Sequence, residues 1–287
     1  MAGHMNVIWI HGSQGCMASI DPPLQVHQLD ANTFVLRQGK CSAPEESFEA
    51  PFLYLLFGED RALLLDTGAS QQVADCPVGP TVRGIIDRWL VHRGRERLPL
   101  VVAHSHSHDD HAAGDAQFAE DVDTTIVPLG VAGVAQFFGI DWPDQQVTFD
   151  LGERTLDVIP LPGHEPSHVA LYDRQAGLLL TGDSLYPGLL VVNDWNAYRA
   201  SIARLRSFAE SREVRFILGG HIEMTAEAGR WFGLGVPFQP GEHVLQLEAR
   251  HLAELDDALQ AMPQPRVDRH ADFIIYPRGQ PLPSLAP

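Results

Sequence analysis

One short segment of the sequence is unusually rich in groups that can bind a metal or transfer a proton. Residues 104–111 read HSHSHDDH, so four imidazoles and two carboxylates occupy eight positions. Burying so many polar groups is costly unless each one finds a hydrogen bond or a metal ion. Neutral imidazole and carboxylate are the usual donors to Zn²⁺. The segment is therefore the first candidate for a metal site.

Other histidine and aspartate residues follow apolar segments elsewhere in the chain. Each of these segments has the length of a buried strand, and ligands in α/β proteins gather beyond strand ends. We therefore expect the polar residues to converge with residues 104–111 at one edge of the fold. They are Asp66 after ALLL, His164 after DVIPLPG, Asp183 after LLLTG and His221 after FILGG.

The spacing of these residues suits a pair of metal ions. His106 and His108 are two positions apart on a tight turn and can point to one metal. Asp110 and His111 lie beyond that turn and can face a second metal. Asp183 has two carboxylate oxygens and could bridge both. His164 and His221 would complete the two sets of ligands.

The chemistry of such a site is hydrolysis. Two metals about 3.5–4 Å apart can hold a hydroxide between them and polarise a carbonyl or phosphoryl oxygen. Because the metals lower the pKa of bound water, that water becomes a nucleophile near neutral pH. The ligand set suits two Zn²⁺ ions, although iron, manganese or cobalt could occupy it.

The segments that position these residues alternate between strand and helix patterns. Apolar runs predict strands at 24–30, 33–38, 52–58, 61–68, 99–105, 124–128 and 214–220, four more between 146 and 183, and an edge strand at 271–277. Helical periodicity predicts helices at 81–94, 112–120, 129–138, 195–212 and 242–262. This alternation is typical of the α/β class.

Composition and charge weigh against several classes of protein. A net charge of −17 disfavours nucleic acid as a partner. Cys16, Cys41 and Cys76 are scattered and form no CxxC pair, so we expect neither a disulfide framework nor a thiolate metal site. The sequence shows no apolar run long enough to span a membrane and no secretory signal pattern. We therefore predict a cytoplasmic protein without a membrane partner.

No repeat or linker divides the chain. The opening residues MAGHM resemble a cloning remnant, and residues 1–22 are expected to form a loose leader. Residues 23–287 are predicted to form a single domain. Within it, residues 222–287 match no motif and are interpreted as a C-terminal extension that serves as a cap or as a homodimer contact.

Taken together, the motifs resemble those of the metallo-β-lactamase-fold superfamily, in particular its glyoxalase II and lactonase-like branch. The resemblance implies a four-layer αββα sandwich. It also implies that His106, His108 and His164 bind one metal, that Asp110, His111 and His221 bind the other, and that Asp183 bridges them. The matching segments occur in the family's order: LLLDTG (63–68), SHSHDDHAAG (105–114), PGHEPSH (162–168), TGDSLYPG (181–188) and GGH (219–221).

The resemblance also implies roles for residues beyond the ligands. Asp66 would hold a ligand histidine in place by a hydrogen bond. Tyr186 follows Asp183 by three residues, where lactone-opening members carry a tyrosine that hydrogen-bonds the substrate. Together with Asp110 and Asp183, Tyr186 is therefore a catalytic candidate. Two further histidines, His104 and His168, are interpreted as packing residues, and for His168 a second interpretation is that it supports a ligand.

The predicted activity is hydrolysis of a small carbonyl substrate, which is a carboxylic ester, a lactone or a thioester. A metal-bridging hydroxide would attack the carbonyl carbon, and Asp110 or Asp183 would receive the proton. Asp183 argues against β-lactamase activity, because true β-lactamases generally carry Cys or Ser at that position. The segment SLYPGLLVVND lacks the Gly-Cys-Gly-Arg-like signature that glyoxalase II enzymes use for glutathione.

Two alternative activities stay open at this stage. A phosphodiesterase or nuclease shares the ligands but needs a positive surface, which Arg199, Arg204 and Arg206 could supply near the metals. A mononuclear iron sulfur dioxygenase shares much of the same motif. The segments 39–51 and 187–198 are expected to flank the mouth of the site, with Phe48, Leu189, Trp195 and Tyr198 as candidate lining residues.

Overall fold

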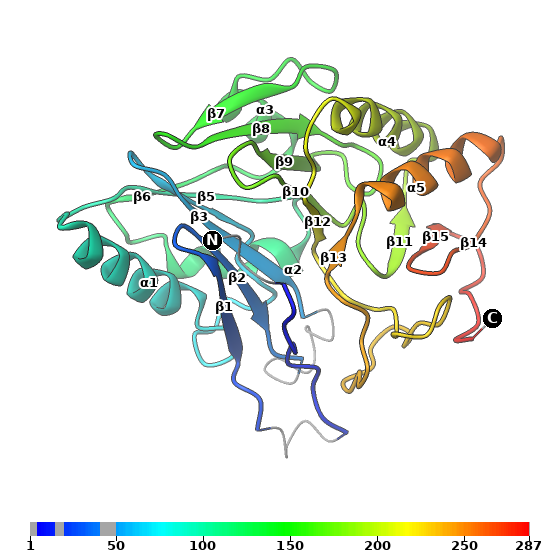
Figure 1. The fold of residues 1–287 in the computed structure, drawn as a ribbon, viewed down its shortest axis with the longest axis horizontal. Helices are drawn as coiled ribbons and strands as arrows, with labels where there is room; N and C mark the ends of the chain where they lie inside the picture. The colour runs from blue at the N-terminus through cyan, green and yellow to red at the C-terminus, as the bar shows by residue number, and fades with distance from the viewer. Residues whose placement is uncertain (1–4, 15–19, 41–49, 287) are drawn as a thin grey trace.

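Two mixed six-stranded sheets form the centre of the structure, which is a computed structural model describing residues 5–14, 20–40 and 50–286 (Figure 1). The first sheet has the order β1–β2–β3–β4–β5–β6. Its strands are Leu24–Asp30, Thr33–Gln38, Phe52–Phe57, Ala62–Leu65, Leu100–Ala103 and Thr124–Ile126. The second has the order β13–β12–β10–β9–β8–β7. Its strands are Gln246–Leu247, Phe216–Gly219, Leu178–Gly182, Val169–Asp173, Thr155–Pro160 and Val147–Asp150.

Both faces of the central strands are buried, which explains their nearly continuous apolar sequences. In β4, Leu63 and Leu65 point into the cluster between the two sheets, whereas Leu64 points to the outer cluster. In β10, Leu180 faces the first sheet and Leu179 faces away from it. Each fully buried leucine stabilises the fold by about 1.5–3 kcal/mol relative to an exposed one. The sheets are therefore held face to face by this shared cluster.

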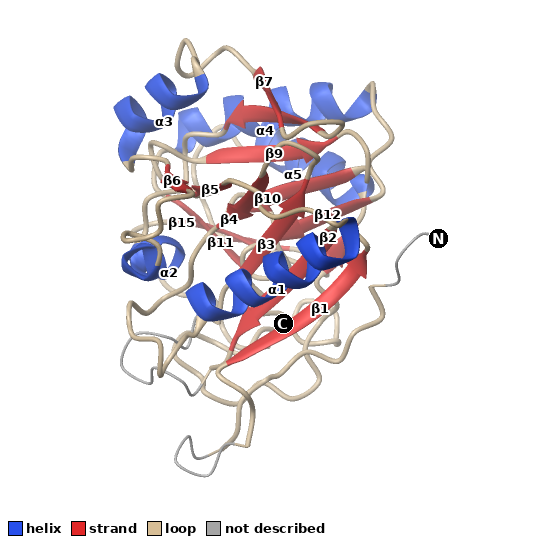
Figure 2. Ribbon diagram, turned by 90° about the vertical axis from the view of Figure 1, so that its left-hand side faces the viewer, coloured by secondary structure: helices blue, strands red, loops and turns tan. Residues whose placement is uncertain are grey.

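Helices cover the outer faces of both sheets. Helix α1 (Val78–Arg93) packs on the first sheet, while α4 (Trp195–Glu210) and α5 (Ala249–Ala261) pack on the second. A shorter helix, α3 (Gly130–Phe138), contributes Val134 to the cluster between the sheets. Figure 2 shows the strands lying between α1 and the α4–α5 pair. The predicted αββα sandwich is confirmed.

The helix predicted at 242–262 begins only at Ala249. Within 242–248, Leu245 and Leu247 are buried while Val244 is exposed, so burial follows the two-residue period of a strand. β13 pairs there with β12, and Glu248 then caps α5 by a reciprocal capping box with His251. The part of the predicted extension that spans β13 and α5 thus lies in the second sheet and its covering layer.

The helix predicted at 112–120 is a short helix α2 (Asp109–Ala112) followed by the 3₁₀ helix η2 (Ala113–Gln117).

A third sheet of three strands was missed in part by the sequence patterns. Its order is β11 (Leu189–Val192), β15 (Ile274–Pro277) and β14 (Asp268–Arg269). The edge strand predicted at 271–277 corresponds to β15. β11 lies within the stretch 187–198, for which the sequence patterns predicted no strand, and it pairs in parallel with β15.

The described part of the leader packs against the sandwich, so the expectation of a loose segment is wrong for it. Met5 and Trp9 are buried in the cluster between the sheets, and the Trp9 ring meets the Phe52 ring edge-on at a centroid distance of 4.9 Å. Of the cysteines, Cys76 is buried and free, whereas Cys16 and Cys41 lie outside the described residues. Among the residues that the structure describes, no helix is both long and apolar enough to cross a membrane.

Candidate metal centre

Five strands carry the predicted site residues on the loops that follow them. β4 runs parallel to β5, and β10 runs parallel to β12. β8 has the same direction as β10, because both pair antiparallel with β9. The carboxyl ends of parallel strands meet at one edge of a sheet, so these loops share that edge. They bring in Asp66, residues 104–111, His164, Asp183 and His221.

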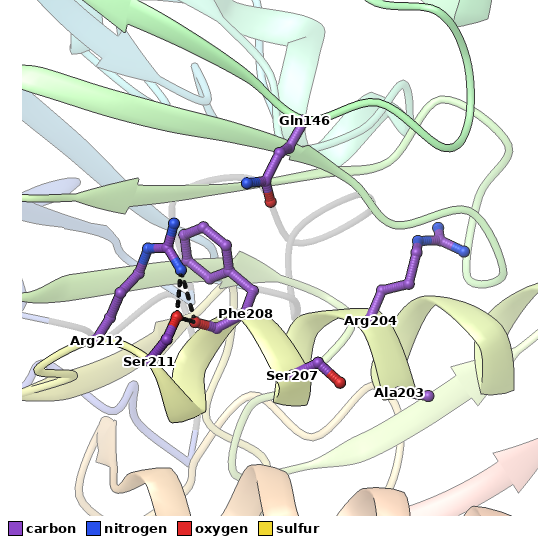
Figure 3. A pocket seen from close by; sticks show the side chains of 7 residues that line it. All are labelled: Gln146, Ala203, Arg204, Ser207, Phe208, Ser211 and Arg212. Atoms are coloured by element: carbon purple, nitrogen blue, oxygen red, sulfur yellow. Dashed lines mark hydrogen bonds between the residues drawn. The ribbon is translucent and has the colours of Figure 1, made fainter.

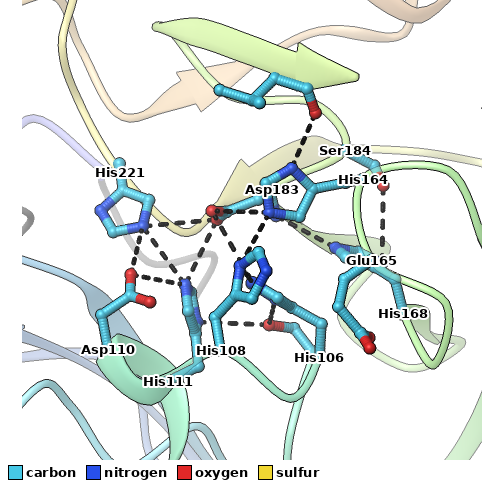
Figure 4. Close-up of polar contacts among 12 residues, drawn as sticks. His106, His108, Asp110, His111, His164, Glu165, His168, Asp183, Ser184 and His221 are labelled. Carbon is cyan, nitrogen blue, oxygen red and sulfur yellow. Dashed lines mark hydrogen bonds and ion pairs between the residues drawn. The ribbon is translucent and has the colours of Figure 1, made fainter. Parts of the chain in front are cut away.

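The structure gathers the seven predicted ligands into two groups. In each group the candidate ligand atoms all lie within 4.8 Å of one another. Figure 4 shows the side chains pointing toward a common centre. The first group is His106, His108 and His164, and the second is Asp110, His111, Asp183 and His221.

Asp183 lies between the two groups. Its Oδ2 is 3.6 Å from Nε2 of His164 and 3.9 Å from Nε2 of His106. Its Oδ1 is 3.4 Å from Nε2 of His111 and from Nε2 of His221. Although Oδ1 is buried, it has no hydrogen-bond partner. A buried carboxylate oxygen without a hydrogen bond is costly unless positive charge lies close to it, and a metal ion or the protonated rings of His111 and His221 could supply that charge.

The imidazole nitrogens of the first group face one another. Nδ1 of His108 lies 2.9 Å from Nε2 of His106 and 3.2 Å from Nε2 of His164. A nitrogen of a neutral imidazole either donates or accepts, so the three rings cannot all be satisfied by one another. Their lone pairs converge instead on one region, as ligands of a shared cation would.

Hydrogen bonds from behind hold two of the rings in place. Nδ1 of His111 donates to Oδ2 of Asp66 at 2.9 Å, so its Nε2 faces the site. Nδ1 of His164 donates to the carbonyl of Val191 at 2.8 Å, with the same result. Asp66 also accepts from the amide and hydroxyl of Ser105 at 2.7 and 2.9 Å, and it has a positive φ of 68°. Backbone strain of this kind occurs most often at active sites and ligand-binding sites.

The two histidines interpreted as packing residues lie outside both groups. Nε2 of His104 pairs with Oδ1 of Asp115 at 2.8 Å. The His168 ring stacks on the His106 ring at a centroid distance of 5.0 Å, and its Nε2 accepts the amide N–H of Asp183 at 3.2 Å. His168 therefore also positions the backbone of Asp183.

The electrostatics of the two groups differ. Burial lowers the pKa of His106 and of His164, which favours their neutral forms. Burial also opposes charge on His111 and His221, but the nearby carboxylates outweigh it and raise the pKa of both rings. In return, these histidines overcome the effect of burial on Asp183 and hold its pKa well below the usual range. In the second group, the carboxylates and the rings therefore favour one another's charged forms.

A cavity of about 190 Å³ opens onto the centre. Five of its lining residues are predicted site residues: His108, Asp110, His164, Asp183 and Tyr186. Leu189 lines it as expected, while Trp195 and Tyr198 pack in the core and Phe48 lies outside the described residues. Val191 and Asn193 also line it and belong to the stretch 187–198 that was expected to flank the mouth. The sequence analysis missed the remaining wall residues, which are Glu223, Leu234 and Arg278. Glu223 follows His221 by two residues, but no motif marks the others.

Tyr186 lines this cavity, and its hydroxyl forms hydrogen bonds within the protein. The hydroxyl lies 2.7 Å from the carbonyl oxygen of Leu189 and 3.1 Å from Oε2 of Glu223. The Tyr186 ring packs edge-on against the His221 ring at a centroid distance of 5.6 Å. In this arrangement Tyr186 supports the wall formed by β11 and by His221.

The three arginines considered for a basic stripe do not line the metal cavity. Arg199 donates to the carbonyl of Leu259, and Arg206 forms ion pairs with acidic residues that include Asp256. Arg204 lines a separate, open cavity of about 480 Å³ along α4, which Arg212 lines at its other end (Figure 3). In the described part of the chain, these three arginines therefore form no basic stripe beside the candidate metal site.

Comparisons with known proteins agree with this geometry. A family profile described as the metallo-beta-lactamase superfamily matches residues 48–262. The human acyl-coenzyme A thioesterase MBLAC2 is 25% identical over 224 residues, covering 66% of this chain and 78% of the relative. The hydroxyacylglutathione hydrolase of Anaeromyxobacter dehalogenans (strain 2CP-C) is 30% identical over 139 residues, covering 47% of this chain and 46% of the relative. A solved metallo-beta-lactamase from Pontibacter korlensis superposes with a TM-score of 0.51 at 19% identity, over 83% of this chain and 99% of that one.

Proposed function

Because the chain belongs to the metallo-β-lactamase superfamily, we propose that it is a dinuclear zinc hydrolase of a small carbonyl substrate. The substrate is a carboxylic ester, a lactone or a thioester. Curated relatives of the chain are named as an acyl-coenzyme A thioesterase and as hydroxyacylglutathione hydrolases, which favours the thioester. The observation that carries the proposal is the place of Asp183, with one carboxylate oxygen facing each group of ligands.

The residues of the site fit a pair of divalent metals. The donors are imidazole and carboxylate groups, the ring nitrogens converge, and Oδ1 of Asp183 is buried without a hydrogen bond. Two zinc ions bound here would supply Lewis acidity and would lower the pKa of water near the substrate. The complete second group, with Asp110, His111 and His221, supports two metals over a single iron.

The chain's own groups would orient these ligands and handle the proton. Asp66 and the carbonyl of Val191 fix the rings of His111 and His164, and the His168 ring fixes the backbone at Asp183. Asp110 lines the cavity, and we assign it the role of receiving the proton released in hydrolysis, with Asp183 as the other candidate. A contact between Tyr186 and the substrate stays a prediction, and it would require its hydroxyl to turn from Leu189.

Zinc binding at neutral pH is expected to release protons from His111 and His221. Their pKa values are raised, so the metal-free protein holds protons on them at pH 7 that zinc must displace. His106 and His164 have lowered pKa values and contribute none. Titration calorimetry in two buffers with different ionisation enthalpies measures the release. Zinc affinity should also fall as the pH is lowered from 8 to 6, and an affinity independent of pH would contradict the assignment.

A panel of substrates tests the proposed function. Zinc-loaded protein is offered a thioester, a γ-lactone, an aryl ester, a β-lactam and a phosphodiester in turn, and acid release is followed in a pH-stat. We expect turnover of the thioester, lactone or ester, which stops when a chelator removes the metal. Turnover of the phosphodiester alone, or no turnover of any of the five by protein shown to hold two zinc ions, would overturn the proposal.

A further inference from the structure

Arg278 stands apart among the described residues that line the metal-site cavity, because no other lysine or arginine lines it. It directly follows β15, and its backbone amide donates to the carbonyl of Val192 in β11 at 2.9 Å. This bond fixes the start of the side chain at the cavity wall. The side chain is exposed, and within the described part of the chain its guanidinium forms no ion pair and no hydrogen bond.

The carboxylates in the same cavity are engaged by other groups. Oε2 of Glu223 accepts the amide of Leu189 at 2.7 Å and lies 3.1 Å from the hydroxyl of Tyr186. Asp110 and Asp183 face His111 and His221. The chain has 37 acidic and 20 basic residues, so carboxylate partners for an arginine are plentiful. Arg278 nevertheless lines this cavity without a carboxylate partner among the described residues, and its guanidinium is therefore available to bind a ligand.

Part of the wall of this cavity is apolar. Leu189, Val191 and Leu234 line the cavity, and Leu234 is largely exposed. A ligand that fills the space therefore meets metal-binding groups on one side, alkyl side chains along the wall, and one planar cation. A guanidinium binds carboxylate and phosphate oxygens through paired N–H groups, which gives direction as well as charge.

We propose that Arg278 binds an anionic group of the substrate, a carboxylate or a phosphate, and so selects anionic esters or thioesters over neutral ones. The inference rests on the proposed function, since it names the class of substrate for that reaction. Arg278 acts here as a specificity residue and takes no part in bond cleavage.

Three matched thioesters test this assignment. They share one acyl group and differ at the end of the thiol half, which carries a carboxylate, a phosphate or a neutral carboxamide. For zinc-loaded wild-type protein, kcat/KM should be higher for at least one anionic thioester than for the neutral one. In Arg278→Ala this ratio should fall about tenfold, mainly through KM. Arg278→Lys should recover part of the ratio, because it keeps the charge but loses the paired N–H groups.

Arg250→Ala serves as the matched control. Arg250 is an exposed arginine on α5 that pairs with Glu248 at 3.1 Å and does not line the cavity. If this control lowers the ratio as much as Arg278→Ala does, the effect comes from net charge and the assignment is wrong. An unchanged ratio in Arg278→Ala would also overturn it.

The three thioesters separate the possible sources of the anion and the possible failures. A preference for the carboxylate alone or for the phosphate alone supports the proposal and identifies the group. If wild-type protein hydrolyses all three equally and Arg278→Ala does not change this, the inference fails while the proposed hydrolase activity stands. If zinc-loaded wild-type protein hydrolyses none of them, the thioester form of the proposed function fails first, and the inference fails with it.

Discussion

Asp183→Asn is expected to abolish nearly all turnover while the protein remains folded. The carboxylate lies between the two groups of candidate ligands, with Oδ2 3.6 Å from Nε2 of His164 and Oδ1 3.4 Å from Nε2 of His111. Asparagine has the same shape but offers one neutral oxygen and an amide nitrogen that does not bind zinc. Loss of residues that merely support a ligand costs about 10- to 100-fold in metal affinity or activity, so loss of the shared ligand should exceed that range.

Metal content and activity are measured together for this variant. We expect fewer than two zinc ions per chain, bound more weakly, and kcat lowered by more than about a hundredfold. Circular dichroism and thermal unfolding of the zinc-free proteins establish that the fold is intact. A folded variant with two zinc ions and wild-type turnover would show that Asp183 does not bridge the metals. Asp183→Ala provides a second variant that lacks both oxygens.

Gly220→Ala is expected to damage the same centre by steric pressure. A Cβ atom at this position would lie 2.4 Å from Oδ1 of Asp183 and 3.0 Å from Cε1 of His111. The backbone has little room to yield, because its amide donates to Gly182 at 2.9 Å and its carbonyl accepts from Phe52 at 2.8 Å. The carboxylate must therefore move away from the histidines. Overpacking of this kind lowers the stability of a protein by about 1–3 kcal/mol. Here the strain would be relieved by displacement of the candidate ligand side chains, so metal binding should weaken.

The measurements for Gly220→Ala are zinc affinity and kcat/KM, and both should fall at least tenfold by the same argument. Gly84→Ala in α1 is the matched control, because a Cβ there would meet only Nη1 of Arg88 at 3.6 Å. That control should bind zinc normally and gain up to about 1 kcal/mol of stability from the better helix former. Normal zinc affinity in Gly220→Ala would mean that the carboxylate has another position open to it.

The convergence of the candidate ligands was predictable because local patterns determine it. Runs such as ALLL before Asp66 and LLLTG before Asp183 identify buried strands, and parallel strands deliver their carboxyl ends to one edge. Two histidines two positions apart on a tight turn, His106 and His108, need no distant information to approach each other. The family resemblance then divided six of the residues into two sets with Asp183 as the bridge, and the structure places Asp183 in one group with Asp110, His111 and His221.

The cavity wall was predictable only in part from local patterns. The apolar run at 271–277 predicted a strand, but nothing local in residues 189–192 showed that they pair with residues 274–277 to form a strand as well. Likewise, the pattern of apolar residues at 242–248 is compatible with a helix. In the structure, however, Gln246 and Leu247 pair with β12 at the edge of the second sheet and form a strand. Glu223 and Arg278 reach the cavity by loops whose paths depend on this pairing.

The parallel pairing of β11 with β15 also bears on the order of folding. It joins two segments that are far apart in sequence, and long-range closure of this kind is slow because the loop entropy must be lost before the contacts form. The histidines of the centre stand on strands whose neighbours are mostly closer in sequence. A partly folded chain would therefore be able to bind metal before β11 and β15 complete the wall of the substrate cavity. In that state the backbone N–H and C=O groups along the edge of β11 would be unpaired and prone to aggregation.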